Sequence, residues 1–477
     1  MEYTGKFQEA IKHPIFKTIA EATQSLHLES YVIGGFVRDY FLKRGTAKDI
    51  DIVTVGSGIE LAKKVASLLP GQPKIQVFKT YGTAMLHLDD IEIEFVGARK
   101  ESYGETSRNP IVESGTLEED QNRRDFTINA MAFSLNANNY GALLDPFNGL
   151  SDLKEKIIQT PLNPNITYSD DPLRMLRAIR FASQLNFEIE SKSLAAIEAN
   201  SERLDIITRE RIVEELNKIL ATNRPSVGFL LLKSTKLLER IIPELTALEG
   251  VEDMEGQKHK DNFYHTLEVV DNISEYTDDV WLRWAALLHD IGKAPTKKFD
   301  KKLGWTFHGH EFLGGKMVHK LFRRLKMPLN NKMKFVKKMV TLSSRPIVLA
   351  TEVTDAAIRR LLFDAGDDIE SLMMLCEADI TTKNAMKFKK YHRNFKLVRR
   401  KMKEVEERDR IRNFQPPVSG ELIMDFYDLK PCREIGIIKD AIKEAILEGT
   451  IENNYDEAFE FMKLKANQLG LKSTKNG

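Results

Sequence analysis

The spacing of apolar and polar positions divides the chain into a mixed N-terminal part and a longer helical part. Over residues 1–30 the apolar residues recur at helical spacing and predict one or two short helices. From Tyr31 to Phe95, strand-like runs such as DIDIVTVG alternate with helical runs such as GIELAKKVASLL. This mixture predicts an α/β head built around a small mixed sheet.

Beyond Phe95 the pattern changes twice. Residues 99–119 are polar, contain Gly, Ser and Pro, and predict a mobile loop; RRDFTINAMAFSL and GALLDPFNG then complete the head. From Gly149 onward no persistent strand pattern is present, and helical runs separated by prolines reach the C-terminus. We therefore expect an all-α region after the head.

Bulk composition narrows the class of protein only in part. The 477 residues suggest about three domains, and the formal net charge of +1 means that any RNA-binding surface is a local patch. Cys376 and Cys432 provide no disulfide framework, which fits a reducing compartment. No stretch approaches the ~18 apolar residues of a membrane span. We expect a cytoplasmic protein that does not enter a membrane.

A pair of glycines, an arginine and two aspartates form the first chemical constellation. Gly34-Gly35 follow a predicted strand and open a helix, where backbone N–H groups can approach an anion. Arg38 lies one turn further and can reach a phosphate. Asp49 and Asp51 occupy alternate positions of the next strand, so their carboxylates face the same way.

Converging carboxylates favour a magnesium site. Mg²⁺ prefers oxygen ligands and substrate phosphates, and two such ions on Asp49 and Asp51 can clamp an in-line phosphoryl transfer. Glu92 or Glu94, on a predicted neighbouring strand, could add a third carboxylate. The alternative interpretation is a pair of solvated surface acids.

The segment DDPLRMLRAIRFA, residues 170–182, is the second constellation. Asp171 before a proline predicts an N-cap with proline at the first helical position. Arg174, Arg177 and Arg180 then recur every three residues and repel one another unless an anion lies between them. A nucleotide triphosphate would supply that anion, whereas a solvated arginine face is the alternative.

Four strings, GGFVRD, DID, RRDFTINA and DDPLRMLRAIRFA, occur in an order and at distances that resemble the class II tRNA nucleotidyltransferases, or CCA-adding enzymes, and the related bacterial poly(A) polymerases. The resemblance covers roughly residues 30–220 and includes the neck helix ERIVEELNKIL at residues 210–220. It implies template-independent addition of CCA to the 3′ end of tRNA from CTP and ATP. The complete loop before RRDFT favours full CCA addition.

The resemblance also implies residue roles. Asp49 and Asp51 would be the catalytic magnesium ligands, and Glu210, Arg211 and Glu214 would be neck scaffold. The nucleotide would be held by Gly34, Gly35, Arg38, Arg123, Arg124, Asp125, Asn129, Asp171, Arg174, Arg177 and Arg180.

Within that set, Asp171 and Arg174 would read the base edge. A carboxylate accepts and a guanidinium donates, which matches the amino group and ring acceptors of cytosine and adenine but not the carbonyls of uracil and guanine. The order of C and A is not explained by this pair, and would require the growing RNA end as part of the site.

Four residues further along have the order and setting of an HD phosphohydrolase domain: His265, the pair His289-Asp290, and Asp379, all on predicted helices. Imidazole together with carboxylate suits a divalent transition metal. Satisfied core histidines are the alternative. If active, the domain would hydrolyse a phosphoester such as a 2′,3′-cyclic phosphate or a nucleotide; otherwise it would be a structural support.

Other residues bear on the extent of this metal site. His308 and His310 could be ligands of a second metal ion. However, Ser343-Ser344 occupy the place where HD domains with two metals carry another histidine. Lys293 could hold a phosphate or could be a surface lysine. Two basic segments, residues 316–338 and 387–403, could follow an RNA backbone, or could be solvated helix faces whose aromatic residues point into a core.

Together these observations predict an α/β catalytic head at 1–155, a helical neck for nucleotide and RNA binding at 156–250, an HD domain at 251–385 and a helical tail at 386–477. The rival functions are a poly(A) polymerase and an enzyme adding only CC or only A. A rival from another class is an HD phosphohydrolase whose head only binds tRNA.

Overall fold

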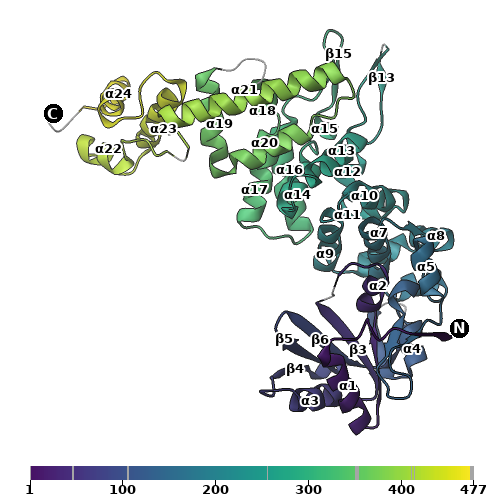
Figure 1. The fold of residues 1–477 in the computed structure, drawn as a ribbon. Coiled ribbons are helices and arrows are strands. Elements are labelled where there is room, and N and C mark those ends of the chain that lie inside the picture. Colours follow the sequence, from purple (N-terminus) through teal and green to yellow (C-terminus); the bar gives the residue numbers. More distant parts are fainter. Residues whose placement is uncertain are drawn as a thin grey trace. The chain divides into compact units, whose positions relative to one another are not determined.

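The computed structural model describes residues 2–45, 48–104, 107–254, 256–349, 354–409, 411–412 and 414–472. The chain forms two compact units, Met1–Pro243 and Glu244–Gly477, each described here by itself (Figure 1). Among the described residues, no helix combines the length and apolarity that crossing a bilayer requires.

A mixed sheet is the centre of the first unit, in the strand order β1-β10-β9-β2-β3-β6-β5-β4. Only the β3–β6 pair is parallel; the other neighbours in this sheet are antiparallel. The strands are β1 (Glu2–Lys6), β2 (Glu29–Ile33), β3 (Asp49–Val55), β4 (Ile75–Phe78), β5 (Thr83–Leu88), β6 (Ile91–Gly97), β9 (Ala132–Ser134) and β10 (Ala142–Leu144). The predicted mixed α/β head is confirmed.

Helices cover this sheet and extend its core. Helix α3 packs on β5 and β6, and α1 packs on α3, so that Ile19, Leu61 and Phe95 are fully buried. The helices of the head are α1 (Pro14–Ser25), α2 (Gly35–Phe41), α3 (Gly58–Leu68), α4 (Leu117–Asn122) and α5 (Gly149–Glu155). The N-terminal residues predicted as helical include α1, but the prediction was wrong for β1, which pairs with β10 at the sheet edge.

The stretch predicted as a loop before RRDFT is instead a hairpin followed by a capped helix. Strands β7 (Arg99–Gly104) and β8 (Ser107–Ser114) pair in antiparallel register, and residues 105–106 lie outside the described residues. Thr116 and Glu119 then form a capping box at the start of α4, in which each side chain accepts from the other's backbone N–H at 3.2 and 3.0 Å. This hairpin is held by hydrogen bonds between backbone groups. Its polar sequence has no alternation of apolar residues, so the strands could not be recognised from the sequence.

Helices make up the rest of the first unit, apart from the short parallel pair β11 (Ile157–Ile158) and β12 (Glu188–Ile189). Helix α7 is central, because it packs against both α9 and α10. The helices are α6 (Pro164–Asp170), α7 (Leu173–Leu185), α8 (Ser191–Ala199), α9 (Arg209–Leu220), α10 (Pro225–Ser234) and α11 (Leu237–Ile241), with α12 (Pro243–Thr246) at the junction of the units in sequence.

The second unit is helical, with two small hairpins: β13 (Asp253–Met254) with β14 (Gln257–Lys258), and β15 (Lys298–Asp300) with β16 (Gly304–Thr306). Its core packs α13 on α14, α14 on α17, and α16 on α17. The helices are α13 (Asn262–Ser274), α14 (Val280–Leu288), α15 (Lys293–Thr296), α16 (His310–Arg324), α17 (Asn331–Leu342), α18 (Arg345–Leu349), α19 (Asp355–Ala365), α20 (Ile369–Ala378), α21 (Ala385–Asp409), α22 (Gly420–Tyr427), α23 (Arg433–Glu448) and α24 (Tyr455–Gln468).

Candidate active site and metal centre

Acidic side chains gather where β3 and β6 run in parallel. The register places Asp49 opposite Glu92 and Asp51 opposite Glu94. Burial and the negative charge of Asp49 raise the pKa of Asp51, although Arg124 opposes the shift. Burial and the charge of Asp51 raise the pKa of Glu94 in the same way. Neighbouring carboxylates repel one another when ionised, and a bound divalent cation relieves this repulsion. These residues therefore fit a metal ion.

Gly34 forms the turn that faces this acidic cluster. Its φ is +84°, a conformation that favours glycine. A Cβ at this position would lie 3.3 Å from Nη1 of Arg124 and 3.4 Å from Oδ2 of Asp51. The predicted glycine turn therefore meets a metal-ligand candidate and an arginine at close range, which is the arrangement expected of a phosphate site.

Arg38 is nearly buried in the first unit. Its Nη1 donates to Oδ1 of Asn129 at 2.8 Å, and its Nε donates to Oδ1 of Asp39 at 2.9 Å. The guanidinium also lies 4.9 Å from the centre of the Phe181 ring. Three sequence motifs thus meet at Arg38, which is held in place by protein groups.

Asp120 is a buried acceptor that the sequence argument missed. Nε of Arg123 donates to its Oδ1 at 2.9 Å, and Nε of Arg124 donates to its Oδ2 at 3.2 Å. Arg123 also donates to Glu101 on β7 at 3.2 Å. The spacing of three and four residues between Asp120 and the two arginines was a signal that could have identified this support.

Asp125 and Arg177 connect the head to α7. Nη2 of Arg177 lies 2.6 Å from Oδ2 of Asp125, and Nδ2 of Asn129 donates to Oδ1 at 3.1 Å. Burial raises the pKa of Asp125, but Arg177 and Asn129 outweigh it and lower the pKa to about 2. The carboxylate is therefore ionised at neutral pH.

These side chains surround a pocket of about 230 Å³, lined by Arg123, Arg124, Asp125, Asp171, Arg174, Arg177 and Arg211. Nη2 of Arg174 donates to the carbonyl of Arg123 at 2.6 Å. Oδ1 of Asp171 accepts from the backbone N–H of Leu173 at 3.2 Å, but the N-cap of α7 is Pro172, so the prediction of Asp171 as N-cap was wrong by one residue. Most of the predicted nucleotide-binding residues converge here.

The surroundings of Arg180 and Arg211 are the reverse of those predicted, in which Arg180 was a nucleotide-binding residue and Arg211 was scaffold. Arg180 is buried and its Nη1 lies 3.3 Å from Glu215 on α9, away from the pocket lining. Burial lowers the pKa of Arg180, and Glu215 opposes that shift. Arg211, predicted as scaffold, instead lines the pocket. Glu214 is exposed and pairs with Lys218.

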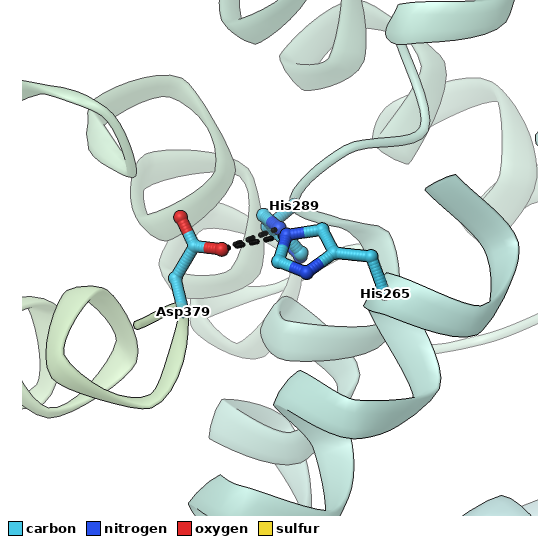
Figure 2. A group of neighbouring side chains, drawn as sticks. All are labelled: His265, His289 and Asp379. Carbon is cyan, nitrogen blue, oxygen red and sulfur yellow. Dashed lines mark ion pairs between the residues drawn. The ribbon is translucent and has the colours of Figure 1, made fainter. Parts of the chain in front are cut away.

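The second unit brings together three side chains that could hold a metal ion (Figure 2): His265, His289 and Asp379, whose ligand atoms all lie within 4.8 Å of one another. Oδ1 of Asp379 lies 2.7 Å from Nε2 of His265 and 3.7 Å from Nε2 of His289. Oδ2 of Asp290 lies 3.3 Å from Nε2 of His289. The predicted quartet therefore converges, from α13, the end of α14 and the end of α20.

His289 is oriented for metal binding. Its Nδ1 lies 2.7 Å from the carbonyl of Ala286, which directs Nε2 toward the two aspartates. This buried Nε2 has no hydrogen-bond partner among the described residues. Burial lowers the pKa of His289, but Asp290 and Asp379 outweigh it and raise the pKa to about 9. An orphaned buried nitrogen beside two carboxylates fits a divalent metal ion.

Of the two histidines considered as ligands of a second metal, only one lies near the first site. Nε2 of His310 lies 3.6 Å from Oδ1 of Asp290, whereas His308 is exposed. The hydroxyl of Ser344, which stands where a further histidine ligand was expected, donates a hydrogen bond to Glu311. Nζ of Lys293 lies 2.6 Å from Oδ2 of Asp290, so Lys293 belongs to the site.

A cavity of about 480 Å³ adjoins His265 and Asp379. Its polar wall is Lys260, Thr381 and Thr382, and its apolar wall is Ile347, Ile380, Tyr391 and Phe395. Tyr391 and Phe395 come from the basic segment considered for RNA binding; Phe395 is buried, and Tyr391 is 37% exposed. Phe395 thus packs into the core, and Tyr391 lines the cavity while part of its ring remains exposed.

Comparison with known proteins agrees with this arrangement. Residues 30–159 match the poly A polymerase head domain, residues 186–249 the probable RNA and SrmB-binding site of polymerase A, and residues 262–384 the HD domain. The fold and the head site define a nucleotidyltransferase of the poly(A) polymerase type that carries an HD domain; both domains imply dependence on divalent metal ions.

Individual relatives narrow the family. The chain is 34% identical to the multifunctional CCA protein of Shewanella frigidimarina over 377 residues, 74% of this chain and 84% of that protein. It is also 34% identical to the A-adding tRNA nucleotidyltransferase of Aquifex aeolicus over 295 residues, 61% of this chain but 35% of that protein's length. The chain belongs to the family of CCA-adding enzymes and multifunctional CCA proteins.

Solved structures give the same fold. A CCA-adding enzyme in complex with ATP aligns with a TM-score of 0.64 at 21% identity, covering 98% of this chain and 99% of that one. The Thermotoga maritima CCA-adding enzyme in complex with tRNA aligns with a TM-score of 0.60 at 21% identity, covering 98% and 99%. At this identity the likeness concerns the fold.

Proposed function

We propose that this protein adds C, C and A, without a template, to the 3′ end of tRNA in the cytoplasm, using CTP and ATP and releasing pyrophosphate. The observation that carries the proposal is the meeting of Asp51, the Gly34 turn and Arg124 beside the pocket that contains Asp171 and Arg174. The residues proposed to bind metal, phosphate and base thus all belong to one unit. The names of the relatives support the same activity.

Asp49 and Asp51 would hold Mg²⁺, with Glu94 as the third carboxylate because it lies opposite Asp51 in the β3–β6 register. When bound, the metal supplies charge neutralisation at the phosphates and makes the attacking 3′-hydroxyl more acidic. The chain's own contribution is positioning: the backbone at Gly34-Gly35 and the guanidinium of Arg124 receive the phosphates.

At the other end of the pocket, Asp171 and Arg174 would select the base. Oδ1 of Asp171 is used by the backbone of Leu173, which orients the carboxylate and leaves Oδ2 to accept from an amino group. Arg174 is steadied by its hydrogen bond to the carbonyl of Arg123. An acceptor beside a donor matches cytosine and adenine, and opposes uracil and guanine.

The test is incorporation of labelled nucleotides onto tRNA lacking CCA, tRNA ending in CC, and an unrelated RNA. We expect C and then A on the tRNAs alone, with Asp51→Asn lowering the rate at least ~100-fold because a metal ligand is lost. Asp90→Asn, at an exposed acid between β5 and β6, is the matched control. Addition of A alone to any RNA would identify a poly(A) polymerase instead, and A without C on tRNA an A-adding enzyme.

A second activity, phosphoester hydrolysis by the HD domain, is favoured by two observations: the orphaned Nε2 of His289, and a cavity of about 480 Å³ that is lined by His265 and Asp379 of the same cluster. A divalent transition metal would be held by His265, His289, Asp290 and Asp379. We expect release of phosphate from 2′,3′-cyclic nucleotides with Ni²⁺, Co²⁺ or Mn²⁺, abolished by Asp290→Ala and retained in Asp51→Asn. No release with any of the three metals would contradict this activity.

These roles correspond to a division into a catalytic head at 1–155, a neck at 156–250, an HD domain at 251–385 and a tail at 386–477. The three family matches, at 30–159, 186–249 and 262–384, support that division. Limited proteolysis, with fragment masses measured, would test it, because cuts are expected close to the three boundaries.

A further inference from the structure

We infer that Arg211 binds a phosphate of the RNA 3′ end, and so makes the growing RNA part of the base-reading pocket. The inference rests on the proposed nucleotidyl transfer and goes beyond it, because the resemblance placed Arg211 among scaffold residues. Its basis is the packing of α9 on α7, the distribution of charge in the pocket, and the position of the phosphate turn.

Packing of α7 on α9 directs Arg211 into the pocket. Arg180 on α7 contacts Glu215 on α9 at 3.3 Å, and the hydroxyl of Ser183 on α7 contacts that of Thr222, two residues after the end of α9, at 3.0 Å. The residue number rises from the first contact to the second on both sides, from 180 to 183 and from 215 to 222. Helices α7 and α9 therefore run in the same direction. Arg211 lies one turn before Glu215 on the same helical face, and is therefore level with the start of α7.

Charge in the pocket is unbalanced. Five arginines line it, against the two carboxylates of Asp125 and Asp171. The other four arginines each bond a protein group: Arg123 and Arg124 bond Asp120, Arg174 bonds a backbone carbonyl, and Arg177 bonds Asp125. Within the described ranges, Arg211 has no such bond. Its guanidinium therefore keeps all of its donors for an anion from outside the protein.

The position of the phosphate turn indicates which anion this is. The triphosphate end of the site is at Gly34, where Arg124 and Asp51 approach within 3.4 Å of a Cβ position. Arg211 projects from α9, level with Asp171 and Arg174 at the start of α7, which form the base end of the pocket. The phosphate that arrives at the base end belongs to the acceptor RNA, whose terminal nucleotide must lie beside the incoming base.

The experiment measures Arg211→Ala and Arg211→Lys with tRNA ending in CC and ATP. We expect KM for tRNA to rise about tenfold in Arg211→Ala, with kcat and KM for ATP within about twofold of wild type. Arg211→Lys, which keeps the charge, should recover most of the loss. The slope of log(kcat/KM) for tRNA against log[salt] should fall in magnitude by about 0.7 in Arg211→Ala, as for one single-stranded phosphate contact. Arg209→Ala, on the same helix but outside the pocket lining, is the control.

Equilibrium filter binding of the same tRNA without nucleotide keeps this inference separate from the activity itself. Weaker binding by Arg211→Ala supports the contact even if the protein proved to add no nucleotide. A rise in KM for ATP with unchanged tRNA affinity would overturn the inference and assign Arg211 to the triphosphate; unchanged values for both would overturn it as well. Arg211→Met, which keeps the aliphatic stem, replaces the alanine variant if circular dichroism shows that variant unfolded.

Discussion

Nη2 of Arg177 on α7 lies 2.6 Å from Oδ2 of Asp125 in the RRDFTINA motif, and this nearly buried carboxylate joins the head to the neck. The same carboxylate accepts from the backbone of Phe126 at 2.9 Å and from Asn129 at 3.1 Å. Its ionised form is thus stabilised on several sides, which has a consequence for the stability of the first unit.

We expect the Asp125 contribution to stability to disappear in acid. Its pKa is about 2 in the folded protein, against an ordinary value of 3.8. A lowered folded pKa contributes stability that is present above about pH 4 and is lost as pH falls toward 2, by ~2 kcal/mol in total. Urea unfolding followed by circular dichroism should therefore show a gap between wild type and Asp125→Asn that narrows between pH 5 and pH 3. The gap for Asp205→Asn, at an exposed acid, should be small throughout, and a pH-independent gap for Asp125→Asn would contradict the assignment.

Gly34→Ala should lower nucleotidyl transfer by up to ~100-fold, because its Cβ would make a tight contact with Nη1 of Arg124 at 3.3 Å and would occupy the space where a phosphate is expected to bind. The backbone strain at φ +84° adds about 1–3 kcal/mol of instability. Gly45→Ala separates the two effects: Gly45 also has a positive φ, +89°, but a Cβ there meets nothing within 4 Å. Rates and thermal midpoints of both variants provide the check. Equal rates in the two variants would count against a phosphate site at Gly34.

Asp171→Ala should relax base choice. Losing one partner of the Asp171–Arg174 pair is expected to lower the ratio of kcat/KM for CTP over UTP by about 10- to 100-fold, equivalent to ~1–3 kcal/mol per base contact. Single-nucleotide incorporation on tRNA lacking CCA measures this ratio. Asp170→Asn changes the adjacent acid, which lies outside the pocket lining, and should leave the ratio unaltered. A fall in rate with the ratio preserved would show that Asp171 acts only through its hydrogen bond to the start of α7.

Metal binding by the HD site should release a proton and strengthen as pH rises. The pKa of His289 is raised to about 9 by Asp290 and Asp379, so its imidazole is protonated at neutral pH in the metal-free protein. A metal ion needs the neutral ring, and its apparent affinity therefore increases with pH until about pH 9. Calorimetric titration with Ni²⁺ in buffers of different ionisation enthalpy measures the protons released. His308→Ala should not change the titration, whereas Asp379→Ala should abolish it; binding independent of pH would contradict the protonated state.

Much of the site could be predicted because its spacing is local. Period two alone places Asp49 and Asp51 on one face of a strand, and the structure supports β3 at these positions. The hairpin at 99–114 and the strand β1 were missed for a common reason. Their stability comes from backbone pairing, in the case of β1 with the distant β10, and such pairing leaves no apolar period in a polar segment.

The arginines of α7 mark the boundary between what sequence and tertiary structure decide. By itself, the sequence determined that Arg174, Arg177 and Arg180 share a stripe, because 3.6 residues per turn fix each side chain's direction around its own helix axis. It did not determine what each arginine faces. Glu215 on α9 pairs with Arg180, and the same packing brings Arg211 to the pocket. Only the packing of segments far apart in sequence selects neighbours, because ion pairing and burial depend on distances in space.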